Sequence, residues 1–168
     1  MSIRFLSLFA GIGGFDLGLE RAGWECVGQV EIDPFCRAVL EKHWPGTPRW
    51  EDVRSVSGSE VIERCGPVDA VVGGFPCQDI SAAGKGAGIH AERSGLWWEM
   101  LRLVRELRPV WVLAENVPAL RTRGADDVLA AMEEHGYACW PVVVGAWAVG
   151  APHKRDRVWI VGRLGDPS

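Results

Sequence analysis

The chain has 168 residues, of which 48% are hydrophobic and 24% are charged, as is typical of one globular domain. No apolar run is long enough to span a bilayer and the N-terminus lacks the features of a signal peptide, so we expect a cytoplasmic protein with no membrane partner. A net charge of −4 argues against unspecific nucleic-acid binding by the whole chain, and the five cysteines lack CxxC or Cys/His ligand spacing, so we expect no disulfide framework and no metal site.

Short apolar runs alternate with helical patterns through the first half of the chain. In chain order the predicted elements are a strand (residues 3–9), a Gly-rich turn (10–14), a helix (15–22), a strand (26–30), a helix beginning at Pro34, a weak strand (50–53), a helix (59–65) and a strand (70–73). Gly23 suits the end of the first helix. Pro34 suits the first turn of the second helix, whose apolar face is marked by Phe35, Ala38 and Val39.

A segment rich in small residues interrupts this alternation in the second half of the chain. The predicted elements are a loop (79–93), a helix (96–107), a strand (110–114), a helix (126–135) and two closing strands (137–146 and 157–161). Ser94 is placed to cap the helix that follows the loop. The strand at 110–114 is almost continuously apolar, which is typical of a strand that is buried on both faces.

Strands that alternate with helices predict a doubly wound, mostly parallel α/β sheet. Neither a repeat nor a linker divides the chain, so we expect residues 1–168 to form one domain. In such sheets ligands bind outside the carboxyl ends of the strands. Three groups of chemically notable residues lie at predicted strand ends, at positions 9–14, 76–78 and 115–116.

The Gly-rich turn predicts a binding site for an adenosine-containing cofactor. Glycines permit a tight turn and let a ligand approach the backbone closely, and the N-terminus of the following helix favours an anion. Glu31 ends the second strand, where a carboxylate can accept hydrogen bonds from ribose hydroxyls. A purely structural turn is the alternative, and the position of Glu31 favours the cofactor.

Cys77 is the candidate nucleophile. Pro76 fixes the backbone before it, a loop follows it, and Glu115 ends a neighbouring strand. A thiolate at this position would therefore have the partial exposure and polar support that reactive cysteines need. The alternative is an inert, buried cysteine that acts as a small hydrophobic residue.

Glu115 and two arginines are the candidate charged groups of the site. Glu115 ends the most apolar strand, where an unpaired carboxylate is costly, so we expect it to face the crevice. Its alternative role is to cap the following segment. Arg155 and Arg157 precede the last strand, and by themselves they are equally consistent with an ordinary charged start of a strand.

A series of ordered motifs resembles those of the DNA (cytosine-5) methyltransferases and covers nearly the whole chain. The matching positions are residues 9–14, Glu31, Asp52, 74–78 (GFPCQ), 93–96 (RSGL), 115–117 (ENV) and 150–157 (GAPHKRDR). The resemblance implies a Rossmann-like methyltransferase fold with an antiparallel last strand, S-adenosylmethionine as the cofactor and DNA as the partner. The residues that it assigns to the cofactor are Phe9, Ala10, Gly11, Ile12, Gly13, Gly14, Glu31, Ile32, Asp52, Val53 and Pro76.

The resemblance also implies a mechanism. Cys77 would add to C6 of a cytosine that is flipped out of the duplex, so that C5 can take the methyl group. Glu115 would hydrogen-bond N3, Arg157 would contact O2, and Arg155 would support the site. Residues 79–93 would close over the base as a lid. The residues available to DNA in this region are Gln78, Ser81, Lys85 and Arg93.

The sequence departs from the family in two respects. His153 stands where Gln is usual, and the chain ends at Ser168, without the target-recognition region and the C-terminal helix of usual members. We prefer a small bacterial or phage-encoded enzyme that works alone, for example in restriction–modification, because every catalytic residue is present. The alternatives are a catalytic subunit that needs a second polypeptide or self-association, and a non-catalytic protein that binds the cofactor or DNA. RNA is a less expected substrate.

Overall fold

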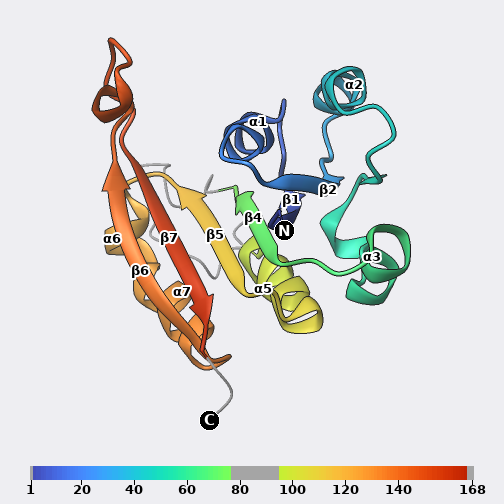
Figure 1. Cartoon of the computed structure of the whole chain (residues 1–168). Coiled ribbons are helices and arrows are strands. Elements are labelled where there is room, and N and C mark those ends of the chain that lie inside the picture. Colours follow the sequence, from blue (N-terminus) through green and yellow to red (C-terminus); the bar gives the residue numbers. More distant parts are fainter. Residues whose placement is uncertain (1, 77–94, 166–168) are drawn as a thin grey trace.

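The computed structural model describes residues 2–76 and 95–165, which form a seven-stranded sheet with helices on both faces (Figure 1). The strands are β1 Arg4–Leu8, β2 Glu25–Val30, β3 Arg49–Trp50, β4 Ala70–Gly74, β5 Trp111–Asn116, β6 Tyr137–Val144 and β7 Arg157–Leu164. The helices are α1 Gly14–Arg21, α2 Pro34–His43, α3 Gly58–Cys65, α5 Leu96–Leu107, α6 Leu120–Arg123 and α7 Ala125–Glu133, with 3-10 turns η1 Val53–Ser55 and η3 Ala146–Val149. The predicted doubly wound α/β fold is confirmed.

The sheet is parallel except at one end. Its strand order is β3-β2-β1-β4-β5-β7-β6. The first five strands in this order pair in parallel, whereas β7 is antiparallel to both β5 and β6. The prediction of a mostly parallel sheet with an antiparallel last strand is therefore confirmed, and the carboxyl ends of β1, β2, β4 and β5 meet along one edge.

Local sequence signals explain where the helices α2 and α3 begin. The Asp33 side chain accepts a hydrogen bond from the backbone N–H of Cys36, and Pro34 occupies the first turn of α2. The Ser57 hydroxyl accepts the N–H of Glu60 in the same way at the start of α3. The twelve-residue helix α5 follows the predicted apolar spacing. Within residues 2–76 and 95–165, no helix has the length and apolar character that crossing a membrane requires.

Between β2 and α3, one predicted strand is present as β3 with other bounds, and one prediction is wrong. The strand predicted at residues 50–53 ends at Trp50, because the Asp52 side chain accepts the N–H of Arg54 at 3.0 Å and starts the turn η1 instead. The apolar face predicted for α2 is incorrect, since Phe35 is 72% exposed and Leu40 is the residue that the helix buries.

Smaller differences concern element boundaries. The helix predicted at residues 126–135 starts at Ala125 and ends at Glu133, and the short elements α6 and η3 have no predicted counterpart. The N-cap of α5 is Gly95, one residue after the predicted cap Ser94, which lies outside the described residues.

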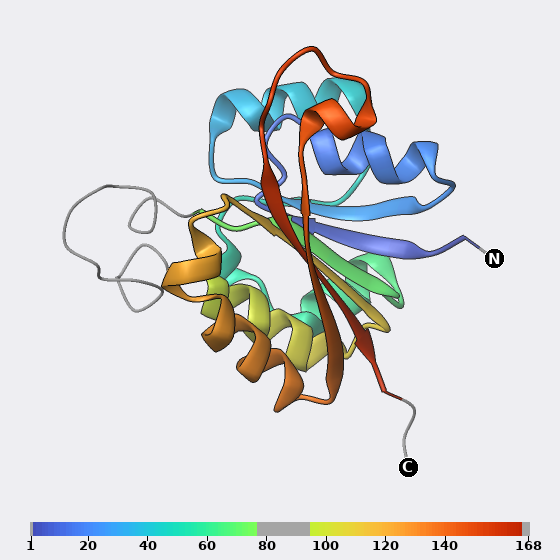
Figure 2. The same cartoon turned by 90° about the vertical axis from the view of Figure 1, so that its left-hand side faces the viewer.

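The sheet separates two apolar layers of different extent, with α1 and α2 on one side and α5 and α7 on the other (Figure 2). The layer that includes α5 and α7 buries long apolar side chains such as Leu103 and Met132 completely. On the α1 side the buried cluster consists of Phe5, Ala70 and Val72, surrounded by partly buried residues. One face of the sheet is therefore thoroughly covered and the other is not.

Candidate active site

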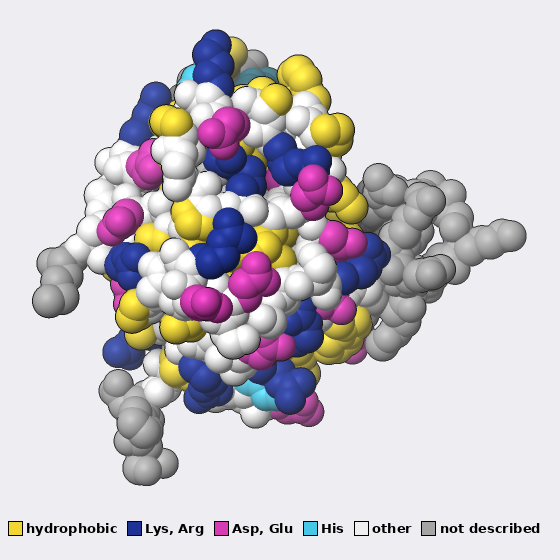
Figure 3. Space-filling model, turned by 90° about the vertical axis from the view of Figure 1, so that its right-hand side faces the viewer, with side chains coloured by type: hydrophobic (Ala, Val, Ile, Leu, Met, Phe, Trp, Pro, Cys, Tyr) yellow, Lys and Arg dark blue, Asp and Glu magenta, His cyan; other side chains and the backbone are white. Residues whose placement is uncertain are grey.

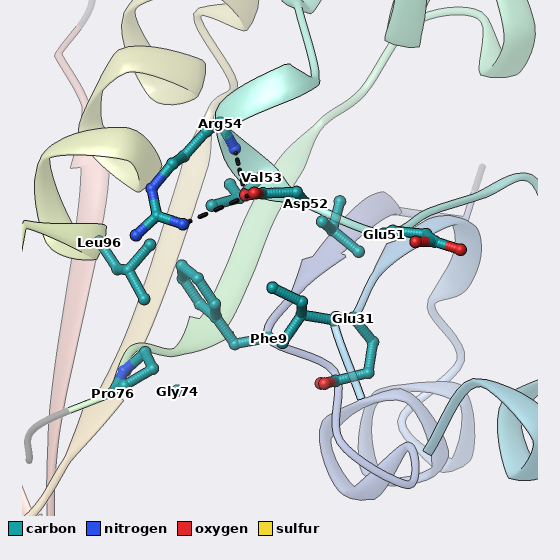
Figure 4. Close-up of a pocket in the computed structure, with 11 residues that line it drawn as sticks. Phe9, Glu31, Glu51, Asp52, Val53, Arg54, Gly74, Pro76 and Leu96 are labelled. Carbon is teal, nitrogen blue, oxygen red and sulfur yellow. Dashed lines mark hydrogen bonds and ion pairs between the residues drawn. The ribbon is translucent and has the colours of Figure 1, made fainter. Parts of the chain in front are cut away.

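A pocket of about 240 Å³ opens at the carboxyl edge of the sheet (Figure 4). Its lining consists of Phe9, Val30, Glu31, Ile32, Glu51, Asp52, Val53, Arg54, Gly74, Pro76 and Leu96. Six of the predicted cofactor residues are among them, namely Phe9, Glu31, Ile32, Asp52, Val53 and Pro76. The structure therefore brings together residues that lie far apart in the sequence, as the convergence of strand ends predicts.

Glu31 is held rigidly by backbone hydrogen bonds. Its side chain accepts the N–H of Gly11 at 2.7 Å on one oxygen and the N–H of Asp33 at 2.8 Å on the other. The residue is 9% exposed. Because each carboxylate oxygen can accept more than one hydrogen bond, Glu31 retains acceptor capacity that faces the pocket, which suits a vicinal pair of ribose hydroxyls.

Phe9 has a backbone conformation that side chains rarely adopt, with φ of 54°. Such conformations cost energy and are concentrated at binding and active sites. In Figure 4 the ring of Phe9 extends between Leu96, Pro76 and the loop of Asp52. It supplies an apolar surface of the kind on which a planar base can stack.

None of the other residues of the Gly-rich turn lines this pocket, although the N–H of Gly11 holds Glu31 at its wall. Ile12, Gly13 and Gly14 line a separate hollow of about 330 Å³ between α1 and α2, and Ala10 is buried beneath the turn. A side chain at Gly13, where φ is 88°, would collide with the ring of Trp44. This glycine is therefore required by the turn and by the contact between α1 and α2.

Asp52 is fixed at the rim of the pocket by its own turn. One carboxylate oxygen accepts the N–H of Arg54, and the other lies 3.5 Å from Nη1 of the same arginine. The carboxylate therefore remains at the pocket, where it can also accept a hydrogen bond from a ligand amino group.

The prediction missed five lining residues: Val30, Glu51, Arg54, Gly74 and Leu96. Four of them neighbour predicted residues in the sequence, so extension of each predicted position by one or two residues would have found them. Leu96 is the exception, because it reaches the pocket from the first turn of α5. It stands in the RSGL motif, which is the signal that could have identified it.

A second group of side chains lies beyond the pocket, at the ends of β5 and β7. Arg157 Nε is 2.6 Å from Glu115 Oε1, and both side chains are partly buried. Burial raises the pKa of Glu115 above its ordinary value, although Arg157 and Arg155 both oppose this shift. Glu115 therefore protonates more readily than an exposed carboxylate, which would allow it to donate a hydrogen bond.

Backbone features support this pair. Arg155 has a φ of 131°, a strained conformation close to the charged pair. Glu115 lies opposite Gly74 in the sheet, and a Cβ on Gly74 would lie 2.9 Å from Glu115 Oε2. The glycine therefore makes room for the carboxylate at this strand end.

Asn116, which the sequence marks as part of the ENV motif but to which it assigns no role, joins the ends of β4 and β5. It is buried, its Nδ2 donates to the carbonyl of Phe75 at 3.1 Å, and its Oδ1 accepts the N–H of Val117 at 2.8 Å. Since Pro76 follows Phe75 directly, Asn116 fixes the backbone at the point where the chain leaves the pocket.

Five predicted site residues lie outside the described residues: Cys77, Gln78, Ser81, Lys85 and Arg93. The described cysteines are poor candidates for a nucleophile. Burial raises the pKa of Cys26, Cys36 and Cys65, and it raises the pKa of Cys139 to about 11, so all four remain thiols at neutral pH. Outside the gap at 77–94 and the chain ends, no three His, Cys, Asp or Glu side chains are grouped to bind a metal ion.

The surface charge is mixed on the face that carries α2 and α3. Figure 3 shows acidic and basic side chains interspersed over this face, without an extended region of one sign. A polyanion such as DNA would gain little from such a face. Residues 153–155 are instead exposed on the β6–β7 hairpin, and Arg155 among them interacts electrostatically with Glu115.

Three comparisons place the chain among known proteins. A family model described as C-5 cytosine-specific DNA methylase matches residues 3–167. The Type II methyltransferase M.HgiCII of Herpetosiphon aurantiacus is 39% identical over 98% of this chain and 38% of its own length. The Type II methyltransferase M.AquIA of Picosynechococcus is 37% identical over 98% of this chain and 74% of its own length.

Among solved structures, an E. coli prophage protein described as a DNA modification methyltransferase superposes with a TM-score of 0.81 and 29% identity. The match covers 99% of this chain and 49% of that one. Spodoptera frugiperda DNMT2 has the same fold, with a TM-score of 0.81 at 20% identity. The chain thus spans about two fifths of the length of M.HgiCII and about half of the length of the prophage protein.

Proposed function

The chain belongs to the C-5 cytosine-specific DNA methylase family, and from this premise we propose that it transfers a methyl group from S-adenosylmethionine to C5 of a cytosine in DNA. The family uses this cofactor and acts on DNA.

The pocket residues fit an adenosine cofactor. Glu31 offers free acceptor positions to ribose hydroxyls, Asp52 offers a carboxylate to an exocyclic amino group, and Phe9 offers a flat apolar surface. Leu96 and Pro76 complete an apolar wall. Bound here, S-adenosylmethionine would supply an electrophilic methyl group on a sulfonium.

Cys77 follows Pro76 directly, so we assign to it the nucleophilic role. Its thiolate adds to C6 of the cytosine and forms a C–S bond, while the electron pair of the C5–C6 double bond makes C5 nucleophilic. After C5 has taken the methyl group, its proton leaves to a base or to water. The electron pair of that C–H bond restores the double bond and expels Cys77 as the thiolate. Because the ring must be reached from one face, the base has to leave the stack.

Glu115 and Arg157 are suited to hold the base. A carboxyl group that protonates readily can donate to N3 of the cytosine and so stabilise negative charge that develops on the ring. Arg157 can donate to O2, and Arg155 adds positive charge beside both. The position of Glu115 opposite Gly74, three residues before Cys77, is the observation that carries this proposal, because it brings the acid to the strand end that leads to the nucleophile.

The test is methyl transfer by the purified chain. We would incubate it with S-adenosylmethionine and unmethylated mixed-sequence duplex DNA and map 5-methylcytosine by sequencing. We expect methylation by the wild type and by the control variant Cys36→Ala, but not by Cys77→Ala. Equal methylation by Cys77→Ala would contradict the assignment of the nucleophile.

A second candidate function is that of a catalytic part that needs a further polypeptide. Trp140, Val142 and Val144 alternate along one face of β6 and are 52%, 46% and 37% exposed. Figure 1 shows no described helix in front of β6 and β7, whereas α6 and α7 lie behind them. An apolar sheet face of this kind usually marks an interaction site.

This candidate can be separated from the first. A chain that binds S-adenosylmethionine weakly and methylates DNA only after addition of the C-terminal remainder of M.HgiCII would support it. The variant Trp140→Gln should then lose the response to the added polypeptide. Full activity of the chain alone would rule this candidate out.

A further inference from the structure

Arg102 links helix α5 to the loop that forms one wall of the pocket. Its Nη2 donates to the backbone carbonyl of Val53 at 2.9 Å. Its other nitrogens pair along the helix with Glu99 at 2.8 Å and with Glu106 at 3.0 Å. The two acids therefore hold the guanidinium in one orientation, with its remaining edge directed at the loop.

Glu106 continues the same link to the far end of the loop. Its second oxygen accepts the N–H of Gly58, the first residue of α3, at 2.6 Å. A Cβ at Gly58 would lie 2.7 Å from Cβ of Glu106, so the helices approach closely there. Burial opposes ionisation of Glu106, but the Gly58 N–H and Arg102 outweigh it and hold the pKa of Glu106 below its ordinary value.

These bonds fix the distance between two walls of the pocket. One wall is the loop that carries Asp52 and Val53, and the other includes Leu96 on the first turn of α5. Arg102 lies on the same helix as Leu96, under two turns further along. The carbonyl that it holds belongs to the residue next to Asp52, so a shift of the loop would move the Asp52 carboxylate directly.

We propose that Arg102 is a positioning residue that holds Asp52 and Val53 in place to recognise the adenine end of the cofactor. The inference rests on the proposed function, since it assumes that an adenosine cofactor occupies this pocket. Arg102 itself lines no part of the pocket. Arg102 acts on the ligand only through the Val53 carbonyl. Its loss should therefore weaken recognition of the edge of the base that Asp52 can contact.

The experiment compares two ligands that differ at that edge. S-Adenosylhomocysteine carries an amino group on the base, whereas its inosine counterpart carries an oxo group that cannot donate to Asp52. We would measure Kd for both by calorimetry, with the wild type, Arg102→Met and the control Arg105→Met. Arg105 lies on the same helix and is exposed, so the control removes an equal charge without the link to Val53.

The expected result is a loss of discrimination. Arg102→Met should bind S-adenosylhomocysteine about 10-fold more weakly than the wild type, but bind the inosine ligand within about 2-fold of it. Arg105→Met should behave as the wild type does. Arg102→Lys keeps the charge and a hydrogen-bond donor, so its affinity for S-adenosylhomocysteine should fall by an intermediate amount. This variant also keeps the test decisive if Arg102→Met fails to fold.

Three outcomes would overturn the account, at different levels. Equal weakening of both ligands in Arg102→Met and Arg102→Lys would mean that Arg102 merely stabilises the fold. Unchanged affinities in both variants would mean that the link to Val53 has no bearing on the ligand. A folded wild type that binds neither ligand would overturn the proposed function itself.

Discussion

The two halves of the site differ in how they are built. On the pocket side the two carboxylates are themselves held by backbone N–H groups, two for Glu31 and that of Arg54 for Asp52. The side at β5 and β7 rests on an ion pair between two side chains, Glu115 and Arg157. A site held by backbone is formed before the ligand arrives, whereas an ion pair can exchange its partners when a substrate enters. We therefore expect variants on the first side to change binding and variants on the second to change the rate.

The largest expected effect is on the rate. Arg157→Met removes the donor proposed for O2 of the base and leaves Glu115 without its partner. We expect kcat for methyl transfer to fall about 100- to 1,000-fold, while the Kd for S-adenosylmethionine stays within about 2-fold. Single-turnover assays with calorimetry measure both. If Arg157→Met weakened cofactor binding as strongly as it lowered kcat, the two halves of the site would not have separate roles in binding and rate.

The next effect is on binding. Glu31→Gln puts an amide nitrogen against one of the two backbone N–H groups that the carboxylate accepts, so we expect the Kd for S-adenosylmethionine to rise about 10- to 30-fold. With the cofactor at saturation, kcat should change much less. The control is Glu51→Gln, which lines the same pocket with a side chain that is 74% exposed, and it should bind almost normally. Equal effects of the two variants would contradict the role of Glu31.

A smaller effect is expected where the two halves meet. Asn116→Ala leaves the buried carbonyl of Phe75 and the N–H of Val117 without their partner, which should cost about 2 kcal/mol of unfolding free energy. For a chain of this length the Tm should fall by about 4 to 8 °C. The Tm of each variant is measured by calorimetry. The comparison variant is Thr122→Ala, which removes an exposed hydroxyl that makes one hydrogen bond of 3.3 Å. A normal Tm for Asn116→Ala would show that the strand ends do not depend on this residue.

The smallest expected effect is on how the stability of the protein depends on pH, through the ionisation of Glu115. Burial raises the folded-state pKa of Glu115, so the folded state binds this proton more tightly than the unfolded state does. The resulting stabilisation is present at low pH and is lost as pH rises through the folded pKa. Glu115→Gln removes this loss. The difference between the Tm of the variant and the Tm of the wild type should therefore be more positive at pH 7 than at pH 4. The opposite trend would mean that Arg157 and Arg155 outweigh burial.

Much of the fold was predictable because the buried strands are apolar runs of the expected length. The runs that became β4 and β5 lie between polar or Gly-rich segments, so their positions follow from the pattern. The weak strand predicted at residues 50–53 is present as β3 but with other bounds, because a strand of two residues is too short for periodicity to define. Phe35 was misplaced because an exposed aromatic residue on a helix resembles a core residue in the sequence.

The site was predictable as far as its residues are marked by strand ends and motifs. Glu31 and Glu115 are examples, because a carboxylate after an apolar strand is conspicuous. Arg102 was not noted and Asn116 was noted only as part of the ENV motif, since each acts on backbone that is 49 or 41 positions away in the sequence. Such contacts depend on how helices and strands pack, and an arginine on an amphipathic helix gives no sign of them.

The central claim is that Cys77 forms a bond to a cytosine that then receives a methyl group at C5. We would incubate the chain and S-adenosylmethionine with duplex DNA in which 5-fluorocytosine replaces cytosine, since fluorine at C5 blocks the final loss of a proton and leaves the adduct in place. Mass spectrometry should find a covalent complex that carries the added methyl group, with the linkage mapped to Cys77 and absent in Cys77→Ala. A complex linked through another residue, or methyl transfer to DNA without any covalent complex, would contradict the account.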